Sequence, residues 1–136
     1  MYKLVAIDLD GTMLNQYGIV TEETKKAIKK MQENGIEVMI ASGRPTDSVK
    51  TIAKNIESKK YFIAGNGAII YDITNNEIIY ANTLKKQKVL DIIKICESNS
   101  IYYNIYTEKE IIAKNLQHNV LYYHKENLNK EEEDRT

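Results

Sequence analysis

The stretch AIDLDGT, residues 6–12, constrains the fold of this chain more than any other. The residues just before its acids, Lys3 to Ile7, are almost all apolar, which is typical of a parallel strand covered on both faces. Asp8 and Asp10 then close the run. Because an unpaired charge is costly in an apolar interior, the two carboxylates need either partners or a position outside the buried layer.

Strand-like and helix-like segments alternate after this point, which predicts an α/β fold with a parallel sheet. Thr21 is placed to cap one helix, Gly35 to end it, and Pro45 fits the first turn of a second helix. Asn75 and Asn76 form a turn signal between two apolar runs, which predicts a hairpin. Strands are expected within residues 3–7, 36–41, 61–72 and 77–81.

The pattern changes near Thr83 to one helix, 84–97, followed by two short strands within 101–107 and 110–115, around a turn at Glu108 and Lys109. This α+β order predicts a second module, so we expect domains at residues 1–82 and 83–136. Tyrosines of the second module fit strand packing, with a sugar-binding surface as the alternative: Tyr102, Tyr103 and Tyr106.

Charge and cysteine content exclude several classes of protein. The 19 Lys and Arg residues balance 19 Asp and Glu residues, so no overall field favours nucleic acid or an anionic membrane. No segment approaches the ~20 apolar residues of a membrane span, and the N-terminal run is too short for a signal peptide. Cys96, the single cysteine, lies on an apolar helical stripe and is expected to be an inert core thiol. We therefore expect a cytoplasmic protein.

The paired acids have three interpretations. A calcium loop of the EF-hand type is excluded, because Ile19 stands where the bidentate Glu is required. A buried salt bridge needs basic partners, and the neighbouring sequence offers none. The third is a reactive site at the carboxyl end of a strand, where open α/β sheets bind ligands. There Gly11 would turn an N–H toward an anion, while Asp8 and Asp10 would hold a cation such as Mg²⁺.

A second motif, ASGR, also follows an apolar strand and precedes a helix. A hydroxyl from Ser42, the N–H of Gly43 and a helix N-terminus together can bind a phosphate. In a parallel sheet this motif lies near Asp8 and Asp10, so the two motifs predict one site.

Together, the motifs DLDGT, ASGRP and GNGA resemble those of the haloacid dehalogenase-like superfamily, and the third is similar to that of the Cof-like sugar-phosphate phosphatases. The resemblance implies a Rossmann-like core followed by an α/β cap, and Mg²⁺-dependent phosphoryl transfer from a small phosphorylated metabolite. By position, Asp8 is the nucleophile that forms an aspartyl-phosphate. Asp10 protonates the leaving group and then activates water, and its backbone carbonyl helps to hold Mg²⁺.

The resemblance also implies roles for residues of the second and third motifs. Ser42 and Gly43 match positions that bind the transferring phosphoryl group, and Gly11 faces the same group. Arg44 and Asn66 match positions near the entrance, with possible substrate contact.

The chain departs from the family pattern after residue 115. A later lysine and an acidic GDxxND-like motif are absent, so we expect the N-terminal portion of such an enzyme, with an incomplete core, a truncated cap and little activity. The alternative is a non-catalytic module that binds a phosphate ligand or another protein. The strand at residues 3–7 would then be an exposed edge open to self-association.

Overall fold

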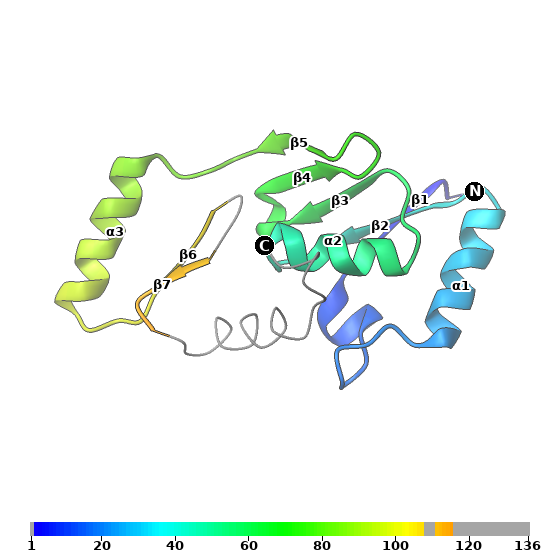
Figure 1. Ribbon diagram of the computed structural model, residues 1–136, viewed down its shortest axis with the longest axis horizontal. Coiled ribbons are helices and arrows are strands. Elements are labelled where there is room, and N and C mark those ends of the chain that lie inside the picture. The colour runs from blue at the N-terminus through cyan, green and yellow to red at the C-terminus, as the bar shows by residue number, and fades with distance from the viewer. Residues whose placement is uncertain (1, 108–110, 116–136) are drawn as a thin grey trace. The chain divides into compact units, whose positions relative to one another are not determined.

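The computed structural model describes residues 2–107 and 111–115. The chain divides into two compact units, Met1–Asn82 and Thr83–Thr136. The first unit carries a five-stranded sheet, and the described part of the second carries one helix and a two-stranded sheet (Figure 1).

The sheet of the first unit is mixed, with strand order β1-β2-β3-β4-β5. The pairs β1–β2 and β2–β3 are parallel, and β3–β4 and β4–β5 are antiparallel. This arrangement confirms the predicted α/β class with a Rossmann-like core. The elements are β1 (Leu4–Ile7), α1 (Glu22–Glu33), β2 (Glu37–Ala41), α2 (Thr46–Asn55), β3 (Tyr61–Ala64), β4 (Ile69–Asp72) and β5 (Glu77–Ala81).

The core of the first unit lies between the helices and one face of the sheet. Right-handed crossovers from β1 to β2 and from β2 to β3 place α1 and α2 on the same face. On that face Val38, Ile40 and Phe62 are fully buried. The ring of Phe62 stacks on that of Tyr71, with centroids 4.9 Å apart. The core therefore links the parallel strands to the antiparallel hairpin.

The other face of the sheet is less buried: its residues in β2 are half-buried, and those in β1 are exposed. Leu4 is 50% exposed, and none of the residues of β1 is buried. The expectation that this strand is covered on both faces is therefore wrong. The physical reason is that β1 is an edge strand, and α1 and α2 cover only one face of the sheet.

Local signals place both helices of the first unit. The backbone N–H of Thr24 donates to Thr21 Oγ1 at 3.2 Å, which confirms the predicted cap of α1. Gly35 follows the helix with φ of 75°, a backbone angle that favours glycine. Pro45 stands one residue before α2, at the capping position, and not in the first turn.

The turn between β4 and β5 is organised by Asp72. Its Oδ1 accepts hydrogen bonds from the backbone N–H of Thr74 (2.8 Å) and of Asn75 (3.1 Å), and its Oδ2 accepts one from the side chain of Asn75 (3.0 Å). The backbone bond from Asn75 is the largest cause of a lowered pKa for the Asp72 carboxyl; burial opposes it, and the other two bonds add to it. The hairpin predicted at Asn75 and Asn76 is confirmed.

We expect this carboxylate to make the first unit sensitive to acid. Because the pKa of Asp72 is lower in the folded state, its contribution to stability is present above its unfolded pKa and is lost as pH falls through the folded value. Urea unfolding followed between pH 7 and 3 should therefore show a smaller loss of stability for Asp72→Asn than for the unaltered chain. Identical pH slopes for the two proteins would contradict the assignment.

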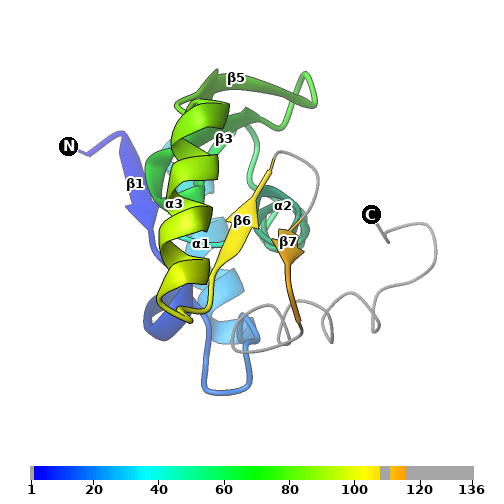
Figure 2. The same ribbon diagram turned by 90° about the vertical axis from the view of Figure 1, so that its left-hand side faces the viewer.

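The second unit begins with α3 (Lys86–Ser98), two residues later than expected. Strands β6 (Asn104–Tyr106) and β7 (Ile111–Ala113) pair antiparallel, as predicted, and the expected turn at Glu108 and Lys109 lies outside the described residues (Figure 2). None of the described helices is long and apolar enough to cross a membrane.

Helix α3 has no buried residue, and Cys96 is only partly buried. The prediction of a core position for this thiol is therefore wrong. Helical periodicity shows which face of a helix is apolar, but packing of that face requires a partner surface.

Candidate active site

Asp8 and Asp10 lie on a turn that is held to the core by Leu9, the residue between them. Leu9 is completely buried, whereas Asp8 and Asp10 are exposed. The backbone carbonyl of Asp8 accepts from the N–H of Met13 at 3.2 Å, which closes the turn directly after β1. The inward side chain of Leu9 therefore fixes the two flanking carboxylates on the outside of the core.

Gly11 allows this turn to form. Its φ is 76° and its ψ is 4°, in the left-handed region that non-glycine residues rarely adopt. A Cβ built at Gly11 meets no atom within 4 Å, so backbone conformation and not space is the reason for glycine here.

The second motif follows β2 at the same edge of the sheet. Ile7 of β1 pairs with Ile40 of β2, so the residues after both strands emerge side by side. Ser42 is buried, and its Oγ accepts a hydrogen bond from the backbone N–H of Arg44 at 3.2 Å. Since this bond uses an acceptor site of the hydroxyl, the hydroxyl hydrogen can still be donated to an anion.

Arg44 joins the two motifs. Its Nε donates to Asp10 Oδ2 at 2.9 Å and its Nη2 to Asp10 Oδ1 at 2.8 Å, so the guanidinium binds both carboxylate oxygens. Nη1 donates to Ser48 Oγ in α2 at 3.2 Å. The Arg44 side chain is 5% exposed and that of Asp10 is 62% exposed. The pair therefore fixes the exposed acid to a buried base.

This contact corrects one conclusion from the sequence. The sequence near the acids offers no basic partner, yet Arg44 pairs with Asp10 from 34 positions away. The parallel sheet brings the two loops together, and adjacent strand ends were the signal that could have found it. The hydrogen bond from Arg44 lowers the pKa of Asp10; burial opposes this shift, and the positive charge of Arg44 adds to it. Asp10 is thus a carboxylate at neutral pH.

The third motif forms the turn Gly65–Gly67 after β3. The N–H of Gly65 donates to the carbonyl of Arg44 at 2.9 Å, and the N–H of Asn66 donates to that of Ser42 at 3.3 Å. A Cβ on Gly43 would lie 2.6 Å from Asn66 Oδ1. The third motif indicates a substrate contact for Asn66, whereas the contact of Asn66 with the second motif is seen only in the structure.

The described residues hold no group of three or more His, Cys, Asp or Glu side chains placed to bind a metal. Both side-chain oxygens of Asp10 are bound to Arg44. The oxygen donors at this edge that Arg44 does not engage are the Asp8 carboxylate and backbone carbonyls, which are suitable in kind for Mg²⁺ and would supply part of its shell.

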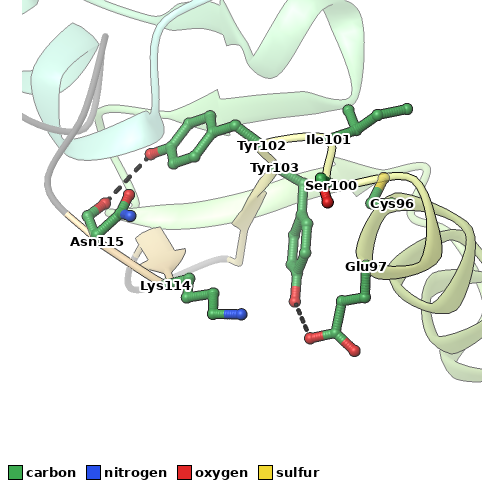
Figure 3. A pocket seen from close by; sticks show the side chains of 8 residues that line it. All are labelled: Cys96, Glu97, Ser100, Ile101, Tyr102, Tyr103, Lys114 and Asn115. Atoms are coloured by element: carbon green, nitrogen blue, oxygen red, sulfur yellow. Dashed lines mark hydrogen bonds between the residues drawn. The ribbon is translucent and has the colours of Figure 1, made fainter.

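A separate cavity of about 330 Å³ lies within the second unit (Figure 3). The Tyr103 hydroxyl donates to Glu97 Oε1, and the Tyr102 hydroxyl donates to the backbone carbonyl of Asn115, both at 3.3 Å. These bonds tie its two tyrosines to the protein itself. The cavity lies between the end of α3 and the end of β7.

Residues 5–136 match the family model of haloacid dehalogenase-like hydrolases. The chain belongs to this family. Among curated members, the phosphatase YwpJ of Bacillus subtilis is 37% identical over 109 residues, which are 80% of this chain and 38% of YwpJ. The 5-amino-6-(5-phospho-D-ribitylamino)uracil phosphatase YwtE of the same organism is 33% identical over 111 residues, 82% of this chain and 38% of YwtE.

Solved structures of the family agree with these matches. A haloacid dehalogenase-like hydrolase from B. subtilis superposes with a TM-score of 0.77 at 34% identity, covering 89% of this chain and 42% of that one. A haloacid dehalogenase-like hydrolase from Bacteroides thetaiotaomicron also gives 0.77, at 27% identity over 90% of this chain and 47% of that one. This haloacid dehalogenase-like chain thus spans about two fifths of the length of the curated relatives described above.

Proposed function

We propose that this chain carries the nucleophile-bearing part of a Mg²⁺-dependent phosphatase that acts on a small phosphorylated metabolite such as a sugar phosphate. The observation that carries the proposal is the meeting of two motifs at one sheet edge, where Asp8 and Asp10 follow β1 and Ser42 follows the adjacent parallel strand β2. Ligands of open α/β sheets bind at this edge.

In the proposed reaction, a carboxylate oxygen of Asp8 attacks phosphorus, and the bond from phosphorus to the ester oxygen breaks. The product is an aspartyl-phosphate, and the leaving oxygen takes a proton from Asp10. Asp10 then accepts a proton from the water that hydrolyses the aspartyl-phosphate. Ser42 and the N–H groups of Gly43 and Gly11 hold the phosphoryl oxygens.

Mg²⁺ would be held by the Asp8 carboxylate and the backbone carbonyl of Asp10, and would neutralise charge on the phosphoryl group. The ion pair between Asp10 and Arg44 affects the two proton transfers of Asp10 in opposite ways. Bound to Arg44, Asp10 is ionised, which is the form that accepts a proton from water. Its donation of a proton to a leaving group requires this contact to weaken. Arg44 contacts the substrate only after such a rearrangement, and Asn66, which is exposed, is a second candidate for substrate contact.

The relatives support the substrate class. YwtE is named for a phosphorylated ribitylamino-uracil, which is a small phosphorylated metabolite. We place the protein in the cytoplasm, where such metabolites occur. Because the matched relatives are more than twice as long as the matched region, we propose that residues 1–136 alone have little activity.

A direct experiment compares two proteins: this chain, and a chimera that continues it past the matched region with the remaining part of YwpJ. Hydrolysis of p-nitrophenyl phosphate should depend on Mg²⁺ in the chimera and be at most trace in the 136-residue chain. Mg²⁺-dependent turnover by the 136-residue chain at the rate of the chimera would contradict the proposal that the chain alone has little activity. A soluble, folded chimera without turnover would count against the phosphatase.

The alternative function is a non-catalytic module that binds a phosphate ligand or another protein. The bidentate contact of Asp10 with Arg44 favours it, because a carboxylate held in this way is a poor acid. The chimera experiment distinguishes the phosphatase from the binding module. A binding module would bind phosphate but would not release phosphate from an ester.

We also propose that a second copy of this chain pairs along β1. Support comes from the position of β1 at the edge of the sheet and from Leu4, which is 50% exposed there. Light scattering should show association that rises with concentration and that Leu4→Lys abolishes. Ile79→Lys is a matched control, because Ile79 is equally exposed on β5 at the opposite edge. A monomer at all concentrations, with strong protection of the Leu4 and Ala6 amides, which point away from β2, would contradict the proposal.

A further inference from the structure

The turn after β3 holds the second motif through a pair of backbone hydrogen bonds, which we call the clasp. Its members are the bond from Gly65 N–H to the Arg44 carbonyl and the bond from Asn66 N–H to the Ser42 carbonyl. These bonds reach both residues that flank Gly43. The conformation of the turn therefore determines how the main chain of residues 42–44 is presented.

The backbone of the turn is unusual. Gly65, Asn66 and Gly67 all have positive φ, at 57°, 56° and 91°. Glycine adopts this region without strain, and asparagine does so more readily than most other residues. Asn66 therefore carries a side chain at a position where glycine would adopt the backbone conformation with less strain. This suggests that the side chain has a function of its own.

Core packing does not explain it, because Asn66 is exposed. Its amide group lies over Gly43: all three atoms nearest to a Cβ built on Gly43 belong to the Asn66 side chain, the closest at 2.6 Å. The side chain therefore occupies the space beside the one residue of the second motif that has no side chain of its own.

We propose that Asn66 is a positioning residue for the phosphate-binding segment 42–44. Its left-handed backbone forms the clasp, and its side-chain amide holds the main chain of Gly43 in one orientation. The inference rests on the proposed function, because the segment is positioned for an anion. It gives Asn66 a role through Gly43 in place of a contact with substrate.

The test uses the ¹⁵N-labelled 136-residue chain with inorganic phosphate as the probe. Asn66→Val forces a β-branched residue into the left-handed region, so the Gly65 and residue 66 amides should exchange at least about fivefold faster with solvent. Asn66→Gly keeps the backbone and removes the amide group. It should leave this exchange unchanged, yet raise the dissociation constant of phosphate, measured at the Gly43 amide, by about threefold or more.

Ser100→Val is the matched control. Ser100 also has a positive φ, 54°, but lies in the second unit. This variant should change neither the Gly43 resonance nor the phosphate affinity.

The outcomes separate the two proposals. No phosphate response at Gly43 in the unaltered chain would reject the phosphate site, and the clasp would then be judged by exchange alone. Equal protection of the Gly65 amide in the Asn66→Val and unaltered chains would reject the clasp. Unchanged phosphate affinity in Asn66→Gly would reject the role of the side chain.

Discussion

Replacing Asp8 by Asn should abolish phosphate release by the chimera with YwpJ, with a fall in turnover of at least about 10³-fold. An amide oxygen cannot take the place of the carboxylate nucleophile, so the aspartyl-phosphate does not form. Because Asp8 is exposed on its turn, the substitution should leave the free energy of unfolding almost unchanged. Release of inorganic phosphate and urea unfolding measure the two effects separately.

Asp91→Asn is the control for this substitution. Asp91 is exposed on α3, and its Oδ1 accepts a hydrogen bond from Gln87 that an Asn side chain can also accept. The control should retain the turnover of the unaltered chimera. If Asp8→Asn kept a tenth or more of that turnover, Asp8 would not be the nucleophile.

Replacing Arg44 by Ala should destabilise the first unit by about 2–3 kcal/mol. The Arg44 side chain is 5% exposed, so its removal leaves a cavity beside α2 and takes away the donors to Asp10 and Ser48. Most of this loss comes from packing, because Asp10 remains solvated when its partner is gone. Urea unfolding monitored by circular dichroism gives the change.

Arg44→Met distinguishes packing from charge. Methionine fills most of the space of the arginine stem without its charge. We expect this variant to recover more than half of the stability lost in Arg44→Ala, while it leaves the pKa of Asp10 closer to that of a free carboxyl. A loss below about 0.5 kcal/mol in Arg44→Ala, the range of ordinary surface substitutions, would show that this arginine does not organise the site.

Local chemistry made much of the fold predictable. A hydroxyl before a helix, an Asn-Asn turn and alternating apolar runs each depend on neighbouring residues, and Thr21, Asn75 and the strands were placed from them. The same holds for the two motifs, since each follows a strand and adjacent parallel strands end at one edge.

What the sequence could not show depends on contacts between distant residues. The pairing of Asp10 with Arg44 and the fit of Asn66 against Gly43 need the register of three strands and the direction of individual side chains. The predictions of which residues are buried were wrong for a different reason. The apolar pattern of β1 and the position of Cys96 identify surfaces suited to packing, whereas their exposure depends on which other elements cover them.

The order of strands in the sheet of the first unit bears on how the chain folds. Every strand of this sheet pairs only with strands next to it in the sequence, so no pairing has to wait for a strand from further along the sheet. We therefore expect the sheet to grow from β1 to β5 in the order in which a ribosome delivers the strands. The strand synthesised first remains open along one side throughout this growth. For a nascent chain, β1 is then an edge at which a chaperone or another strand can pair before β5 forms the opposite edge.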